Sequence, residues 1–152
     1  MTPQEDEAAR GSTLARVADL CYENLPATPD QLLPLRHRLA HWATHTGLAR
    51  EDVDNLILAA DEAVSNVIVH AYPHHPGTFD LRASQEPRDG TVHLTVRAHG
   101  RWRPPPADPG PLHGRGLILI HALTHHTTIE HTVHGTTVHM TWLLPATNHS
   151  PQ

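Results

Sequence analysis

The sequence predicts an α+β fold, a two-layer sandwich with helices on one face of a mixed, largely antiparallel sheet. Two stretches in the first half carry apolar residues at helical spacing, and later segments alternate apolar and polar residues as strands do. The predicted order is helix, helix, strand, strand, loop, helix, strand and strand, with no internal repeat. Runs of elements in this order are typical of helices packed on one face of an antiparallel sheet.

The length of 152 residues fits one domain, which we place at residues 12–144 between disordered tails at 1–11 and 145–152. A formal net charge of −5 argues against a nucleic-acid-binding protein, which usually carries a basic stripe. The N-terminus lacks a signal peptide and no apolar run could span a bilayer, so we expect a cytoplasmic protein. The single cysteine, Cys21, excludes an internal disulfide and is expected to be a small core residue.

The first elements are a strand within residues 14–25 and a helix that follows it. Thr28 has the position of an N-cap, because a proline comes next and Gln31 completes a capping box. Asp30 is an alternative cap, which would place the next proline nearer the tolerant first turn of the helix. Leucines and a tryptophan then recur at helical spacing as far as Gly47, a residue type that commonly ends helices.

The second helix, from Asp52 to about His70, has the most regular pattern in the chain. Opposite its apolar stripe lie Glu62 and Asn66, side by side at i and i+4. A carboxylate and a carboxamide among apolar neighbours indicate the wall of a pocket rather than a solvated surface. The stripe consists of Val53, Leu56, Ile57, Ala60, Val64, Val67, Ile68 and Ala71, and the neighbours of the pair are Leu58, Ala59, Ala63 and Val69.

The chain beyond this helix predicts the sheet. Two prolines and a glycine in residues 72–77 end the helix, and strands follow at 78–83 and 92–96 around a turn at 87–90. Residues 101–114 contain five prolines, which suit neither a helix nor a central strand, so this segment predicts a loop. The remaining elements are a short helix at 116–123 and strands at 127–133 and 136–144, which meet at Gly135.

Three groups of residues could carry chemistry. The Glu62 carboxylate can take a proton from an attacking hydroxyl, and the Asn66 amide oxygen is a hard ligand suited to Mg²⁺. Residues 114–116, Gly-Arg-Gly, precede a helix, where exposed N–H groups and the helix N-terminus favour a phosphate. Gly135 is followed by Thr136 and a second threonine, a hydroxyl-rich start to the last strand.

In this order and spacing, the three groups resemble the GHKL superfamily of ATPases and histidine kinases. Residues 59–72, AADEAVSNVIVHAY, resemble the N-box of the anti-sigma serine/threonine kinases. Residues 100–106, GRWRPPP, and 114–117, GRGL, are similar to the lid region of the actinobacterial branch. The resemblance covers roughly residues 26–144 and implies the Bergerat-type ATP-binding fold.

The resemblance also implies a role for each matching residue. Glu62 would be the general base and Asn66 the Mg²⁺ ligand, in a site that binds ATP. Nucleotide contacts would come from Gly100 of the first glycine box, from Gly114, Arg115 and Gly116 around the phosphates, and from Thr136 near adenine. Members of this family bind a sigma factor, phosphorylate a serine on a small antagonist protein of the STAS type, and are often homodimers. The resemblance therefore implies a cytoplasmic transcription regulator that contacts neither membrane nor nucleic acid directly.

One position departs from the family pattern. The family places an aspartate two residues before Gly100, where it accepts a hydrogen bond from the adenine amino group, and this chain has Ala98 there. The loss of such a charge-assisted hydrogen bond costs about 1.5–3 kcal/mol, or roughly ten- to a hundred-fold in affinity. His99 is adjacent but should point to the opposite face of the strand, so it is a poor substitute.

Two other functions remain open. Because of Ala98, the chain could be a nucleotide-poor binding module of the same fold that sequesters a partner without catalysis. The 16 histidines also allow a metal-binding regulator. His41 and His45 stand at i and i+4 on one predicted helix, as do His121 and His125 on another, and this spacing can chelate zinc or nickel. No cysteine pair accompanies either histidine pair.

Overall fold

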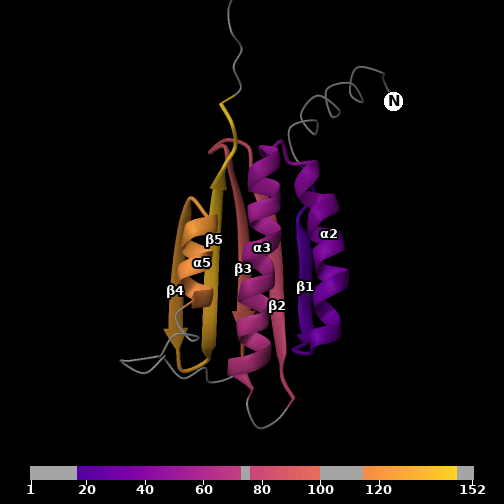
Figure 1. Ribbon diagram of the computed structural model, residues 1–152, viewed down its shortest axis with the longest axis vertical. Coiled ribbons are helices and arrows are strands. Elements are labelled where there is room, and N and C mark those ends of the chain that lie inside the picture. Colours follow the sequence, from indigo (N-terminus) through magenta and orange to yellow (C-terminus); the bar gives the residue numbers. More distant parts are fainter. Residues whose placement is uncertain (1–16, 73–75, 100–114, 147–152) are drawn as a thin grey trace, which may run out of the picture.

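A computed structural model describes residues 17–72, 76–99 and 115–146 of the chain. Five strands form one sheet in the order β1-β2-β3-β5-β4, and all four pairings are antiparallel. Helices α2, α3 and α5 lie side by side over one face of this sheet (Figure 1). The predicted α+β sandwich is therefore confirmed. The elements are β1 (Leu20–Pro26), η1 (Pro29–Gln31), α2 (Leu32–Thr44), α3 (Arg50–Asn66), η2 (Val67–Ala71), β2 (Thr78–Glu86), β3 (Thr91–Ala98), α5 (Arg115–Leu123), β4 (His126–Thr132) and β5 (Gly135–Leu143).

The first helix begins differently from the prediction. Thr28 is extended, as an N-cap should be, but its hydroxyl makes no capping hydrogen bond, and no side chain caps α2 at Gln31 either. The reason is that the Gln31 N–H, which a capping box would direct to the threonine side chain, donates to the Thr28 carbonyl at 3.1 Å. That backbone bond closes the short 3₁₀ turn η1. The predicted end is confirmed, since Gly47 has a φ of +92° just beyond α2.

The core lies between the helices and the sheet. The predicted stripe of α3 is buried at Val53, Leu56, Ala60 and Val64, and it packs over the inward side chains of the strands. Two tryptophans reach the edges of this core, and their indole N–H groups donate to backbone carbonyl oxygens. The largest fully buried side chains are Trp142, Phe79, Leu39, Leu56, Leu81, Leu94, Ile120 and Met140.

Among the described residues, no helix covers the opposite face of the sheet, and this corrects one expectation. Cys21 is exposed rather than buried. It alternates with the inward Leu20 and Tyr22 along β1, and it stands opposite Arg82, which is also exposed. A strand with one covered face sends every second side chain to the other face, so the side of the strand, and not residue type, decided this position. Within the described residues, no helix is long and apolar enough to cross a membrane.

Gly135 is packed closely against strand β3. A Cβ atom at this position would lie 1.9 Å from the Ala98 carbonyl oxygen, and the φ of +142° is one that other residues rarely adopt. We expect Gly135→Ala to lower the free energy of unfolding by about 3 kcal/mol or more, because backbone strain and a clash with backbone add together. Urea denaturation measures this loss.

Gly90 provides the matched control for that substitution. It also has a positive φ, +64°, but a Cβ there would meet nothing within 4 Å. Gly90→Ala should therefore lower the free energy of unfolding by only about 1–2 kcal/mol, the cost of the positive φ without a steric clash. Equal losses in the two variants would show that the contact between Gly135 and the Ala98 backbone is unimportant.

Candidate functional site

Those residues singled out by the sequence that the structure describes lie toward one end of the sandwich. Helix α3 runs toward this end and finishes there with η2, while β3 ends, and α5 and β5 begin, at the same end (Figure 1). Antiparallel pairing brings the last residue of β3, Ala98, directly opposite Thr136 near the start of β5. Segments far apart in the chain thus meet where the α3 pair, the α5 N-terminus and the β5 threonine were predicted to act together.

Two contacts define the flanks of α3. Arg36 of α2 donates to the Asp61 carboxylate at 2.7 Å, which marks the flank facing α2. On another side of the helix, the Asp52 carboxylate lies 3.8 Å from Nε2 of His125, just after α5. That second contact marks the flank facing α5 and β4.

The two residues of the predicted pair differ in where they lie around α3. At 100° per residue, Asn66 falls about 40° from Asp52 and about 140° from Asp61, so it belongs to the flank facing α5. Glu62 falls about 80° from Asp52 and about 100° from Asp61, which places it on the outward side of the helix between the two flanks. Both side chains are partly buried. The helix thus presents the carboxamide toward α5 and the carboxylate outward, with neither facing the sheet.

The neighbours of this pair are apolar, as predicted, but of two kinds. Ala59 and Ala63 are buried, with exposed fractions of 0% and 2%, whereas Leu58 and Val69 are 50% and 62% exposed. Immediately after Asn66 the helix widens into the π-helical turn η2. Turns of this type occur frequently at functional sites, because they change the direction in which successive side chains project.

A row of four side chains crosses the sheet on its helix-facing side at this end. Phe79 of β2, Ala98 of β3, Thr136 of β5 and His131 of β4 are successive Cα partners. Phe79, Ala98 and Thr136 are buried, and the Thr136 hydroxyl lies 3.1 Å from Nδ1 of His131. Ala98 therefore leaves a methyl group at the position where the family pattern has a carboxylate, and Thr136 is the nearest polar partner across the strands.

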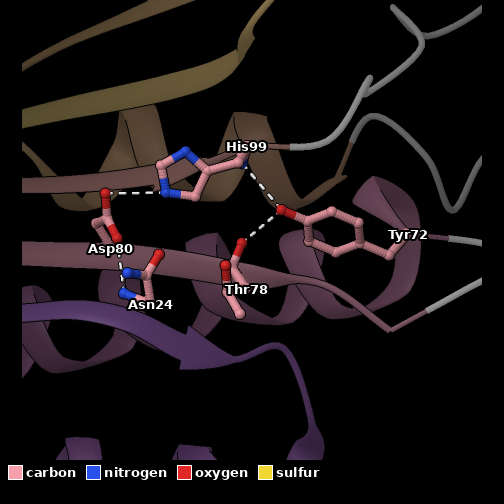
Figure 2. A network of polar contacts seen from close by, with 5 residues as sticks. All are labelled: Asn24, Tyr72, Thr78, Asp80 and His99. Atoms are coloured by element: carbon pink, nitrogen blue, oxygen red, sulfur yellow. Dashed lines mark hydrogen bonds and ion pairs between the residues drawn. The ribbon is translucent and has the colours of Figure 1, made fainter.

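A polar network joins this end to the outer face of the sheet (Figure 2). The Tyr72 hydroxyl, directly after η2, donates to the Thr78 carbonyl and accepts from the His99 backbone N–H at 2.9 Å. The His99 ring lies on the outer face, where its Nε2 is 2.9 Å from Oδ2 of Asp80. The prediction that His99 points away from the helix-facing side is therefore confirmed.

The Asp80 carboxylate is held from two sides. Its Oδ1 accepts the Asn24 backbone N–H at 2.8 Å, and its Oδ2 contacts His99. Burial by itself would raise the pKa of Asp80, but the Asn24 N–H, the His99 ring and the Arg97 guanidinium together lower it below its ordinary value of 3.8. The network therefore favours the charged carboxylate.

Acid should release this contribution to stability. The unfolded chain titrates at the ordinary Asp pKa and the folded chain below it, so the contribution is complete above about pH 4 and is lost as the pH falls through the folded value. We expect wild type to be more stable than Asp80→Asn at pH 7, and the difference to shrink below about pH 4. Urea unfolding between pH 7 and 3 measures it. Asp89→Asn, in an exposed turn, is the control and should show no such convergence.

Other predicted site residues are placed only in part. Gly100 and Gly114 lie outside the described residues. Arg115 and Gly116 open α5, one residue earlier than predicted, which puts the N-terminus of that helix at the site end. Sequence reasoning missed Tyr72 and His131. The second could have been found from the hairpin at Gly135, because a two-residue turn there pairs residue 131 with 136.

The histidine pairs do not form a larger cluster. The rings of His41 and His45 lie 4.7 Å apart, and Nδ1 of His45 is 2.8 Å from the His41 carbonyl oxygen. His125 contacts Asp52 and the Leu143 N–H. In the part of the chain that the structure describes, no group of three or more His, Cys, Asp or Glu residues could hold a metal ion.

Comparison with known proteins identifies the family. The sequence model described as "Histidine kinase-like ATPase domain" matches residues 25–142. The chain belongs to this family. The match begins at the end of β1, includes every described helix and ends one residue before the end of β5. The sandwich and the candidate site therefore belong to one histidine kinase-like ATPase domain.

Three solved structures share the fold. The RsbU and RsbW domains of Rv1364c from Mycobacterium tuberculosis match with a TM-score of 0.67 and 25% identity, over 84% of this chain and 33% of that one. The histidine kinase domain of the blue-light activated histidine kinase from Erythrobacter litoralis EL346 matches at 0.55 and 19%, over 86% and 66%. A longer chain of that kinase matches at 0.56 and 20%, over 71% and 40%. This chain thus spans a third to two thirds of the proteins that it matches.

Proposed function

We propose that this chain is an anti-sigma-factor-like regulator, a protein serine kinase that binds Mg-ATP, sequesters a sigma factor and phosphorylates a small antagonist of the STAS type. The observation that carries the proposal is the Glu62–Asn66 pair, partly buried on the side of α3 away from the sheet, directly before a π-helical turn. Membership of the ATPase family and the likeness to a structure that contains an RsbW domain support it.

The residues near the end of α3 and the start of α5, where the phosphates would lie, fit Mg²⁺ and a nucleoside triphosphate. The Asn66 amide oxygen is a hard donor of the kind that Mg²⁺ takes while keeping waters and bridging to phosphates. The N-terminus of α5 provides backbone N–H groups and a favourable dipole for phosphate oxygens. Bound ATP would supply its γ-phosphoryl group, with ADP as the leaving group. Glu62, one turn before Asn66, would accept the proton of the serine hydroxyl whose oxygen attacks the γ-phosphorus.

The part of the site where adenine would bind, around Ala98, favours a second function. Ala98 is 1% exposed, and its Cα partners on the neighbouring strands are Phe79 and Thr136. No carboxylate stands on the described part of this row to accept the adenine amino group. A domain of this fold that binds nucleotide poorly and sequesters a partner without catalysis is therefore the second candidate.

Titration with Mg-ATP tests the proposal through Asn66. We expect Asn66→Ala to weaken Mg-ATP binding by about ten- to a hundred-fold, because a ligand to a charged group is removed. Isothermal calorimetry measures the affinity, and the helical CD signal and melting temperature should stay nearly unchanged. Loss of folding instead would show that Asn66 is a structural hydrogen-bonding residue.

Asn55 is the matched control for Asn66. It lies on the same helix, is also partly buried and is 11 residues earlier, which places it on the same flank about 16 Å along the axis. Asn55→Ala should leave Mg-ATP binding unchanged.

If wild type binds no Mg-ATP while retaining its partner, the binding-module function replaces the kinase.

A further inference from the structure

The Tyr72 side chain is held at three points where η2 meets the sheet. Its hydroxyl donates to the Thr78 carbonyl at the start of β2 and accepts the His99 backbone N–H, at 2.9 Å, just beyond β3 (Figure 2). Its ring lies against Gly77: a Cβ atom there would be 2.2 Å from two ring carbons, so only glycine leaves room for the ring. Gly77 is itself fixed, because its carbonyl oxygen accepts the Ala27 N–H at 2.9 Å.

The Tyr72 hydroxyl lies at the first position beyond the β2–β3 ladder. The last Cα partners of the two strands at this end are Phe79 and Ala98. Continuing the same register would bring Thr78 opposite His99. The tyrosine oxygen lies between the carbonyl of one and the N–H of the other. A side chain that follows η2 therefore joins the two strands and ties that turn to the residue directly after Ala98.

The turn that Tyr72 ties to the sheet also carries the end of α3. The five residues of η2 separate Asn66 from Tyr72. Turns of this π-helical type are rare, so we expect a contact from outside the helix to keep this one in place. The two hydrogen bonds of the Tyr72 hydroxyl provide that contact. They hold the Asn66 end of α3 at a fixed distance from Ala98 and from the row across the sheet.

We propose that Tyr72 is a positioning residue, which sets the spacing between the phosphate part and the base part of the nucleotide site. A nucleoside triphosphate spans both parts, with Mg²⁺ and phosphates near Asn66 and the base near Ala98. A ligand that contacts two parts of a site gains from both only where their spacing matches its own length. The inference rests on the proposed function, since it requires a nucleoside triphosphate to bind here.

Tyr72→Phe removes the hydroxyl and keeps the ring. In the free protein, amide hydrogen exchange at residues 67–71 and at His99 should accelerate by about five- to a hundred-fold, because two neutral hydrogen bonds are lost. Thr124→Val is the matched control. The Thr124 hydroxyl donates to the Ile120 carbonyl at 2.9 Å, just past the end of α5 that points away from the site. Its loss should leave exchange at residues 67–71 unchanged.

Calorimetry with Mg-ATP and Mg-tripolyphosphate separates positioning from a merely structural role. The affinity of Tyr72→Phe for Mg-ATP should fall by on the order of tenfold, because ATP needs both parts at a fixed spacing. Mg-tripolyphosphate contacts the phosphate part alone, and its affinity should change by less than about twofold. Thr124→Val should bind both compounds as wild type does. If Tyr72→Phe does not fold, Gly77→Ala displaces the ring with the hydroxyl intact and should give the same two results.

Three results overturn the inference in distinguishable ways. Unchanged exchange at residues 67–71 in Tyr72→Phe would show that the hydroxyl does not hold η2, while the proposed nucleotide site stands. Equal losses of affinity for Mg-ATP and Mg-tripolyphosphate, or no loss for either, would show that the hydroxyl does not set the spacing. Absence of binding by both compounds in wild type would overturn the proposed nucleotide site and this assignment with it.

Discussion

Glu62→Gln is expected to lower the rate of phosphotransfer to a serine substrate by about 10²–10⁴-fold, the usual contribution of a general base. An amide of the same shape cannot take the serine proton, and the rate should fall without loss of binding. The measurement is transfer of labelled phosphate from ATP to the antagonist protein, together with affinity for the sigma factor. That affinity should be unchanged, because the substitution keeps the size of the side chain.

The chain provides a matched control on the same helix. Glu51 is 11 residues before Glu62, lies on the same flank three turns away and is exposed in the first turn of α3. Glu51→Gln should leave phosphotransfer at the wild-type rate, at a cost to stability of about 0.3–1 kcal/mol from the helix dipole. An undiminished rate in Glu62→Gln would remove the catalytic role of Glu62.

Ala98→Asp is expected to raise Mg-ATP affinity by up to about a hundred-fold, because it restores a charged acceptor for the adenine amino group. The gain should be selective for ATP over GTP, whose carbonyl oxygen would face a carboxylate with no proton to share. Phosphate and Mg²⁺ contacts are common to both nucleotides and should not discriminate. Calorimetric titration of wild type and variant with both nucleotides measures the effect.

The position of Ala98 adds a second expected result for this variant. Ala98 is 1% exposed, next to Phe79 and the close-packed Gly135, so an aspartate there is buried without a positively charged partner when no nucleotide is bound. An unpaired buried carboxylate is costly, and the free variant should therefore melt at a lower temperature than wild type. Mg-ATP should raise its melting temperature by more than it raises that of wild type.

Ala98→Asn is the matched control for the charge. Its amide has nearly the shape of aspartate but can donate as well as accept, so its gain should be smaller and shared by ATP and GTP. Tight, adenine-selective binding by wild type would show that another group reads the base and would strengthen the kinase assignment. No gain in Ala98→Asp, with the fold intact, would mean that the base position is closed for a further reason.

Elements with local sequence signals could be located from the amino-acid sequence. The apolar period of α3 located that helix, and with it the i, i+4 pair of Glu62 and Asn66, because residues four apart on a helix share a face whatever the rest of the chain does. The turn at residues 87–90 and the left-handed Gly47 were equally local, since positive φ favours glycine. The local signals failed at Thr28, where a backbone bond took the place of the side-chain cap.

Which helices and strands are neighbours could be seen only in the tertiary structure. Helical period placed Glu62 and Asn66 on the side of α3 opposite its apolar stripe, but only the contacts of α3 with Arg36 and with His125 showed that Asn66 faces α5 and not α2. Likewise, alternation marks a strand without identifying its neighbours. The pairing of β3 with β5, which are distant in sequence, places Ala98 opposite Thr136, and the pairing of β5 with β4 places Thr136 opposite His131. Strands pair through backbone hydrogen bonds, which are the same whatever the side chains, so the sequence of one strand does not identify its neighbour.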